Sequence, residues 1–247
     1  MIGVMQRYGD WFKPSDVPGL VSDYDPDNPA LLTLGMGGVV DVLRDPISGI
    51  DLDTTAGGRP TTTTISGRTF LDGDGTQDLY GAIAGVAPPF TIFAIFSSQD
   101  TDPTQSVIWS MCDLSTFDSF FEGQIAWPSS DFLALGRRDS SNVEQGPSTT
   151  NAVVDSQVHL GLWVVNSSTA AGPLRIDNDI ANEGGSVSLT DIQPTNIDTF
   201  ALLAQVDLNP GEYTLGQVGR VLRYSGSLTE TQITRITNFL RGKYRFS

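Results

Sequence analysis

The chain has 247 residues, of which 39% are hydrophobic and only 17% are charged. Its formal net charge is −15, which argues against nucleic acid or an anionic membrane surface as a partner, because both are bound by basic faces. One cysteine and one histidine exclude a disulfide framework and a zinc site built from several such residues. The length fits one large domain, and no repeat or linker divides it, so we expect a single domain over residues 1–247.

One residue type dominates among the acidic residues and one among the basic residues. Aspartate outnumbers glutamate by 24 to 5, and arginine outnumbers lysine by 12 to 2. Glutamate and lysine are the usual residues of exposed helix surfaces, so their scarcity indicates few helices. The abundant Asp, Thr, Ser, Gly and Pro are typical of turns and strands. The composition therefore predicts many strands joined by polar loops.

The predicted strands follow one another along most of the chain, separated by Gly, Pro, Asn and Asp. Both faces of residues 89–96 are apolar, which predicts a central strand covered on both sides. About a dozen short strands at this spacing are typical of a sandwich or a barrel. The clearest candidates are 19–24, 39–44, 61–65, 68–71, 89–96, 106–111, 132–137, 157–165, 174–177, 199–206 and 216–224.

One segment, residues 229–243, has a helical period. Thr229 and Gln232 are spaced as a capping box, although the earlier pair Ser227 and Glu230 offers a second start. Gly242 stands where a C-terminal cap is expected. The apolar stripe consists of Ile233, Ile236, Phe239 and Leu240. We therefore predict an all-β, antiparallel jelly-roll sandwich with one C-terminal amphipathic helix and an N-terminal arm over residues 1–13.

The C-terminal part of the chain is basic while the rest is acidic. Residues 215–247 carry six basic side chains and one acidic one. A solvated helix face beside an acidic sandwich is the interpretation we favour. Docking of the basic segment onto the acidic body, or onto an acidic neighbour, is the alternative.

The order of several motifs resembles a known family. Residues 11–26, 40–49, 58–79 and 219–244 resemble, in this order, the concanavalin A-like and laminin G-like jelly-roll domains of bacteriophage virion proteins. The resemblance implies a virion location and a structural or adhesive role as a capsid decoration, head-fibre or tail-fibre subunit. It also implies a homo-oligomer whose partners are other virion proteins and, as a ligand, host-surface polysaccharide or a neighbouring subunit.

The competing hypothesis is a polysaccharide depolymerase, either a glycoside hydrolase or a lyase. Laminarinase-like enzymes of this fold carry a Glu-x-Asp-x-x-Glu strand, and here the five glutamates are isolated from one another. We therefore assign no catalytic residue and expect a protein that is not an enzyme and requires no cofactor.

A metal site is suggested by one aspartate-rich turn. Asp72, Asp74 and Asp78 alternate with glycines and Thr76, and such oxygen ligands suit calcium. An EF-hand is excluded, because its sixth position needs glycine and holds Gln77 here. The alternative, which we favour, is a turn whose Asp and Gly residues set the backbone geometry.

Other polar residues are weaker candidates for a site. Asp23, Asp25, Asp27 and Asn28 form an acidic turn, and a second polar loop covers residues 177–183. Either loop could line a sugar or ion site, although a structural role is favoured.

The isolated ring residues are also assigned structural roles. His159 has no acid adjacent in sequence to orient it, so we expect a sheet-face histidine rather than a catalytic base. Cys112 is expected to be a buried apolar residue. Four tryptophans are expected to pack in the core or at an interface, with stacking on sugar rings as the alternative: Trp11, Trp109, Trp127 and Trp163.

Overall fold

The structure is a computed structural model that describes most of the chain. The described residues are 12–53, 58–98, 106–114, 119–125, 132–138, 146–153, 155–167, 170–180, 183–184, 197–204 and 213–246.

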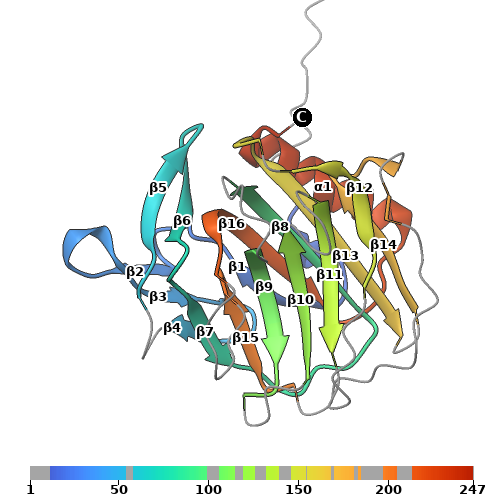
Figure 1. Ribbon diagram of the computed structural model, residues 1–247, viewed down its shortest axis with the longest axis horizontal. Helices are drawn as coiled ribbons and strands as arrows, with labels where there is room; N and C mark the ends of the chain where they lie inside the picture. The colour runs from blue at the N-terminus through green and yellow to red at the C-terminus, as the bar shows by residue number, and fades with distance from the viewer. Residues whose placement is uncertain are drawn as a thin grey trace, which may run out of the picture.

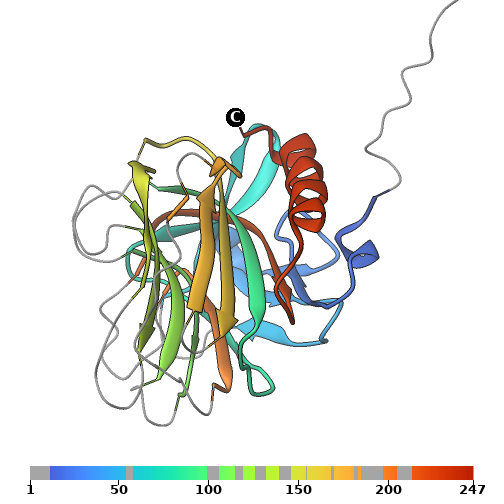
Figure 2. The same cartoon turned by 90° about the vertical axis from the view of Figure 1, so that its right-hand side faces the viewer.

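Two antiparallel sheets face each other across a hydrophobic core, and Figure 2 shows the two layers from the side. The first sheet has seven strands, with β1 (Leu20–Tyr24) pairing with β16 beside the main path. Its order is β14 (Ala170–Ile176), β13 (His159–Ser167), β8 (Phe90–Ser98), β16 (Leu215–Tyr224), β6 (Arg68–Asp74) and β5 (Thr61–Ile65).

The second sheet has nine strands and forms the other layer (Figure 1). Its order is β12 (Ser148–Ala152), β11 (Phe132–Arg138), β10 (Phe120–Ile125), β9 (Ser106–Cys112), β15 (Thr199–Leu202), β7 (Leu79–Ala82), β4 (Asp51–Asp53), β3 (Val40–Arg44) and β2 (Leu32–Leu34). Two short 3-10 helices, Pro14–Asp16 and Met36–Gly38, precede β1 and follow β2.

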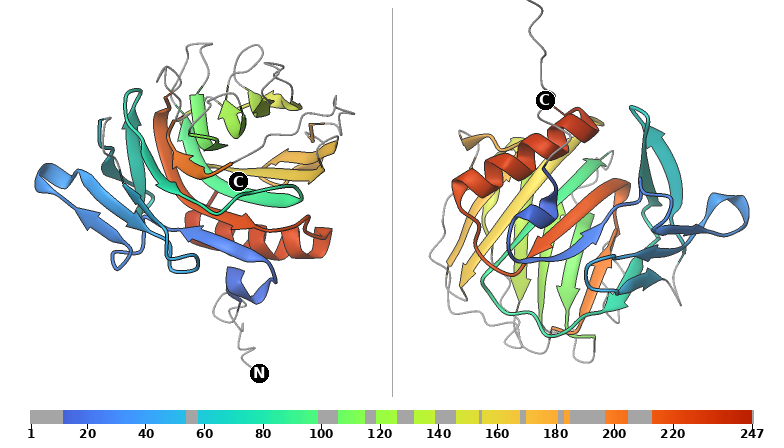
Figure 3. Two further views of the ribbon diagram at one scale, coloured as in Figure 1. Left: turned by 90° about the horizontal axis from the view of Figure 1, so that it is seen from below. Right: turned by 180° about the vertical axis from the view of Figure 1, so that it is seen from behind.

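The central strand β8 is buried on both faces, as its sequence predicts. Phe90, Ile92 and Phe96 point into the core between the sheets, whereas Phe93 and Ile95 belong to a second cluster on the outer face of the seven-stranded sheet. Helix α1 (Glu230–Tyr244) covers that second cluster and crosses the back of the sheet diagonally (Figure 3). The molecule thus has three layers where α1 lies.

Helix α1 begins as predicted and ends later than predicted. The capping box is present, with the Thr229 backbone N–H donating to Gln232 Oε1 at 2.8 Å. The expectation that Gly242 caps the helix is wrong, because the helix continues to Tyr244 and Arg245 adopts the left-handed cap conformation, with φ 57°. The last turn persists since the buried ring of Tyr244 packs edge-to-face on Phe70, with ring centroids 5.6 Å apart.

The structure describes only the last two residues, 12 and 13, of the predicted N-terminal arm. Residues 1–11 lie outside the described part of the chain. Phe12 packs edge-to-face on Phe239 of α1, with centroids 6.0 Å apart, and the Arg235 guanidinium lies over the Phe12 ring. In the part of the chain that is described, no helix is long and apolar enough to cross a membrane.

Candidate functional site

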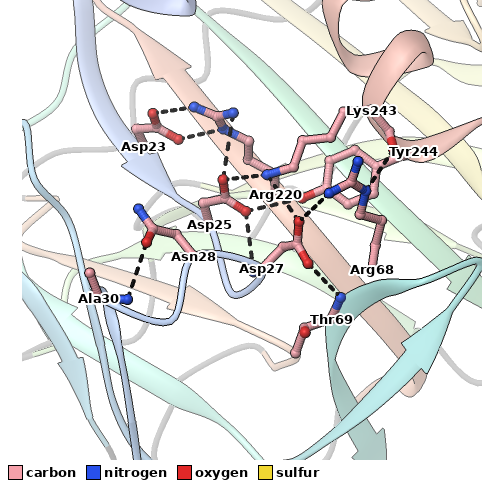
Figure 4. A network of polar contacts seen from close by, with 10 residues as sticks. All are labelled: Asp23, Asp25, Asp27, Asn28, Ala30, Arg68, Thr69, Arg220, Lys243 and Tyr244. Atoms are coloured by element: carbon pink, nitrogen blue, oxygen red, sulfur yellow. Dashed lines mark hydrogen bonds and ion pairs between the residues drawn. The ribbon is translucent and has the colours of Figure 1, made fainter.

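The acidic turn after β1 is the centre of a buried ion-pair network (Figure 4). Asp23 receives a bidentate pair of hydrogen bonds from Arg220, at 2.7 Å from Nε and 2.5 Å from Nη2. Asp25 accepts from Lys243 Nζ at 2.7 Å and from the Tyr244 hydroxyl at 3.1 Å. These contacts join the start of the described chain to its end.

Asp27 completes the network on the side of β6. Its carboxylate accepts from Arg68 Nη1 at 3.2 Å and from the Thr69 backbone N–H at 2.9 Å. Burial alone would raise the pKa of Asp27, but the Thr69 N–H and the nearby Lys243 and Arg68 charges outweigh it and lower that pKa. We call the whole network the terminal clasp: Asp23, Asp25, Asp27, Arg68, Arg220, Lys243 and Tyr244.

The terminal clasp assigns the acidic turn a structural role and divides the basic C-terminal segment into two parts. Arg235 and Arg241 are exposed, as a solvated helix face predicts. Arg220 of β16 is buried and Lys243 is largely covered, and each is paired with aspartates. Arg241 is also engaged, because it donates to the Asp177 carbonyl at 2.9 Å. Docking onto the acidic body therefore describes Arg220 and Lys243, whereas the solvated helix face describes Arg235.

His159 lies between two carboxylates that the sequence did not reveal. Its Nδ1 is 2.8 Å from Asp177 Oδ2 and its Nε2 is 3.0 Å from Asp155 Oδ1. Burial alone would lower the pKa of His159, but the two carboxylates outweigh burial and raise it. Since both ring nitrogens are occupied, the imidazole has no nitrogen left to take a proton from a substrate, which agrees with the structural role expected for it.

The polar loop after β14 is held by hydrogen bonds from Arg175, a residue of that strand. Arg175 is buried and donates from Nε to Glu183 at 2.9 Å and from both terminal nitrogens to Glu230 at 2.8 Å. It also donates to the side chain of Asn178 at 3.2 Å, while Asn182 lies outside the described residues. Arg175 of β14 therefore connects this loop, through Glu183, with the first residue of α1, Glu230.

The predicted calcium ligands already have other partners. Asp72 accepts from Gln217 Nε2 at 2.7 Å, and Asp74 Oδ1 accepts from the Thr76 hydroxyl at 2.7 Å. Asp78 is buried at the beginning of the next strand. Among the residues that the structure describes, no group of three or more His, Cys, Asp or Glu side chains is placed to hold a metal ion. Calcium binding by Asp72, Asp74 and Asp78 remains a prediction.

The described tryptophans and the cysteine are core residues. Trp109 and Trp163 pack edge-to-face with centroids 5.6 Å apart, and Trp163 Nε1 donates to the Ala134 carbonyl at 2.8 Å. They are fully buried and cannot stack on a sugar, and Cys112 is also buried, as expected. Trp11, Trp127, Glu144 and Glu212 lie outside the described residues.

A cavity opens between the two sheets at the edge formed by β1. Its volume is about 580 Å³, within the range typical of ligand sites. One wall is formed by β1 and the end of β16, and the other by the β3–β4 loop and by the segment before β8. The lining is mostly apolar, with a few polar side chains: Leu20, Ile47, Ile50, Val86, Phe90, Ser48, Ser225 and Arg223.

Arg223 is the charged residue of this cavity lining and is 93% buried, with 7% of its surface exposed. Its Nε and Nη2 donate to the Ser22 hydroxyl at 3.3 and 3.2 Å. No carboxylate of the described residues lies within 4 Å of its nitrogens. Burial lowers the pKa of Arg223, and the nearby Tyr24 and Asp45 offset that effect only in part.

A change of register in β16 turns Arg223 toward the interior. The pairing of β16 with β8 shifts between Val218 and Val221, and both valines point into the core between the sheets. Arg223 follows Val221 by two residues and therefore lies on the same face. Sequence reasoning missed this residue, because Val218 and Val221 three residues apart do not show the alternation of a regular strand.

The comparisons with known proteins show a shared fold. No family model matches the chain, and no curated protein matches it. Domain 4 of AbnA, a GH43 arabinanase of Geobacillus stearothermophilus solved in complex with arabinotriose, matches with a TM-score of 0.61 and 14% identity over 89% of this chain and 98% of that one.

Two chains described as botulinum neurotoxin structures also match. The serotype D/C binding domain has a TM-score of 0.63 at 14% identity over 92% of this chain and 53% of that one. A structure of the type C neurotoxin, whose cell entry depends on interaction with two ganglioside molecules, has a TM-score of 0.62 at 11% identity over 90% of this chain and 51% of that one. This chain thus spans about half the length of those chains. The predicted all-β, jelly-roll-like sandwich with a C-terminal helix is confirmed.

Proposed function

We propose that this chain is a carbohydrate-binding sandwich of a bacteriophage particle, which binds host-surface polysaccharide in the cavity beside β1. The observation that carries this proposal is the cavity itself, with its apolar walls and a buried arginine, Arg223, in its lining. Sugar rings offer apolar C–H faces and hydroxyl groups on the same molecule. Sites with apolar linings and a few well-placed polar groups bind such ligands.

The comparisons support the choice of a glycan as ligand. The similar arabinanase domain was solved in complex with arabinotriose, and cell entry of the similar type C neurotoxin depends on interaction with two ganglioside molecules. At 11–14% identity these likenesses concern the fold alone, so the ligand of this chain rests on the cavity.

The proposal is tested by binding of host capsular or exopolysaccharide oligosaccharides in calorimetry. Ala84 is exposed and lines the cavity, so Ala84→Trp is expected to weaken binding at least tenfold by filling the space. Ala30→Trp adds the same bulk on an exposed turn away from the cavity and serves as the matched control. Equal binding by both variants would place the ligand elsewhere, and no binding by the unchanged protein would overturn the proposal.

The same samples test the depolymerase alternative. Oligosaccharides released from the polysaccharide on incubation, detected by mass spectrometry, would show turnover and overturn a function limited to binding. We expect the polysaccharide to keep its length.

The virion part of the proposal rests on the sequence resemblance. We propose that the protein is a decoration or fibre subunit and a homo-oligomer whose partners are other virion proteins. Gold-labelled antibody on gradient-purified particles is expected to mark the particle surface. Light scattering coupled to size exclusion is expected to give the mass of two or more chains of 26.5 kDa each. Particles without the protein, or a monomer in solution, would contradict the respective statement.

Calcium is tested separately by thermal unfolding in EDTA and in added calcium. Because Asp72 and Asp74 are already engaged by Gln217 and Thr76, we expect a melting temperature that does not change. A ligand that binds only the folded protein raises the melting temperature, so an increase with calcium that Asp74→Asn removes would establish the metal site.

A further inference from the structure

We propose that the cavity beside β1 recognises a carboxylate, and that its ligand is an acidic sugar whose carboxylate is bound by Arg223. This inference rests on the proposed glycan-binding function and deepens it by naming the chemical class of the sugar. The argument starts from the charge of Arg223 and then considers its neighbours and the cavity walls.

The buried arginines of this protein differ in how their charge is compensated. Arg220 is paired with Asp23 and Asp25, and Arg175 is paired with Glu183 and Glu230. Arg223 is buried to a similar degree, and its guanidinium lies 6.0 Å from the centre of the Phe200 ring. Its five donor hydrogens have one hydrogen-bond acceptor, the Ser22 hydroxyl. A guanidinium removed from water without an anion is costly, so an anionic partner from outside the chain would complete this site.

Among the described residues, the polar groups around Arg223 include one nearby anion, Asp45, but none in direct contact with the guanidinium. Asp45 is near enough to influence the pKa of Arg223, but its oxygens accept from the backbone N–H groups of Asp23 and Ile47 and from the Ser48 hydroxyl. The ring of Tyr24 is buried and stacks on Phe200, and its hydroxyl is neutral and carries no compensating charge. Arg223 therefore has donor hydrogens for which the described residues offer only the Ser22 hydroxyl.

The shape and lining of the cavity favour a carboxylate over other anions. Two guanidinium nitrogens can donate parallel hydrogen bonds to the two oxygens of a carboxylate in one plane, whereas a sugar hydroxyl offers a single oxygen. Phosphate is more strongly hydrated and carries more charge, so the apolar walls of Leu20, Val86 and Phe90 disfavour it. The net charge of −15 does not exclude an anionic ligand, because exposed charges farther than about 8 Å from the cavity are screened at physiological ionic strength.

The test uses pairs of oligosaccharides that differ only in the carboxylate. Oligosaccharides containing galacturonate, glucuronate or N-acetylneuraminate are compared with their carboxyl-reduced forms in calorimetry. At least one acidic member is expected to bind ten times or more tightly than its reduced form, and Arg223→Gln is expected to abolish the difference. Arg235→Gln, on the exposed face of α1, is the control and is expected to keep it.

The outcomes separate the two proposals. Equal binding of acidic and reduced forms, or an unchanged preference in Arg223→Gln, would overturn carboxylate recognition and leave glycan binding standing. No binding of any member would overturn both. Arg223→Gln is expected to melt no lower than the unchanged protein, whereas Arg220→Gln should melt lower, because only Arg220 has ion-pair partners to lose.

A measurement on the unchanged protein covers the case in which the variant does not fold. The side-chain Nε–H signal of Arg223, assigned by comparison with Arg223→Lys, is expected to shift when the acidic oligosaccharide is added and to stay fixed with the reduced one. A signal that does not move with an oligosaccharide that binds would contradict the inference.

Discussion

Asp25 is the residue on which most of the terminal clasp depends. It is buried and accepts from Lys243 and Tyr244, with Arg220 Nη1 3.5 Å away. Removing its charge would leave two buried or half-buried cations with one fewer anion between them. Asp25 therefore links the C-terminal segment to the acidic turn, together with Asp27, whose carboxylate is 3.3 Å from Lys243 Nζ.

We expect Asp25→Asn to lower the free energy of unfolding by about 3–5 kcal/mol, the usual cost of breaking a buried ion pair. Asp51→Asn is the matched control, because Asp51 pairs with Arg44 on the surface, where both side chains are about half exposed. An exposed pair contributes at most about 1 kcal/mol. Urea denaturation of both variants measures the difference, and equal losses would contradict the importance given to the clasp.

His159 gives a prediction about pH. Its pKa is raised in the folded protein, so its contribution to stability is complete below the unfolded pKa of about 6.5 and is lost as the pH rises through the folded value. The free energy of unfolding is therefore expected to fall between about pH 6 and pH 8 more steeply in the unchanged protein than in His159→Gln. Chemical denaturation across that pH range measures both slopes, and parallel curves would contradict the bridge to Asp155 and Asp177.

At the scale of elements, α1 covers the outer face of the seven-stranded sheet through a narrow stripe. Ile236 is fully buried in the second cluster, while Thr234 two residues earlier is exposed. We expect Ile236→Ala to cost about 2–5 kcal/mol, from lost burial and the space left behind. Thr234→Ala is expected to cost nothing or to stabilise slightly, since alanine has the higher helix propensity. Thermal unfolding of the two variants tests this, and a small loss at Ile236 would mean that the helix is weakly attached.

The elements with strong local patterns were predicted correctly from the sequence. The double apolar pattern of β8 and the capping box of α1 are each local and each correct. Five strands were missed for identifiable reasons. Glu122 and Gln124 made β10 resemble a loop, although both side chains are buried there and share a hydrogen bond. The others are short, polar or interrupted by glycine: β2, β4, β7 and β12.

The candidate site was harder to predict than the fold, because its residues meet only in three dimensions. Asp23 and Arg220 are 197 residues apart, and Asp177 is 18 residues from His159. No spacing rule connects such pairs. The inward direction of Arg223 depends on the register shift in β16, which follows from pairing with β8 and cannot be read from β16 alone.

The whole molecule is expected to unfold as one unit, consistent with the single domain predicted from the sequence. The core between the sheets combines residues from the first strands to the last, including Tyr24, Trp109 and Val221. Far-UV circular dichroism and tryptophan fluorescence should therefore give coincident urea transitions, because two-state unfolding changes both signals together. Separated transitions would show that part of the chain forms an independent domain.

The position of β16 has a consequence for how the protein is made. This strand lies between β8 and β6 and also pairs with β1. Three strands that are translated earlier therefore lack this pairing partner until one of the last segments of the chain has been made. Until the ribosome has released residues 215–224, the nascent chain exposes unpaired strand edges that invite association with other chains. Premature termination in this region should therefore yield aggregates rather than a smaller soluble protein, and a chaperone that shields such edges should raise the yield of the complete one.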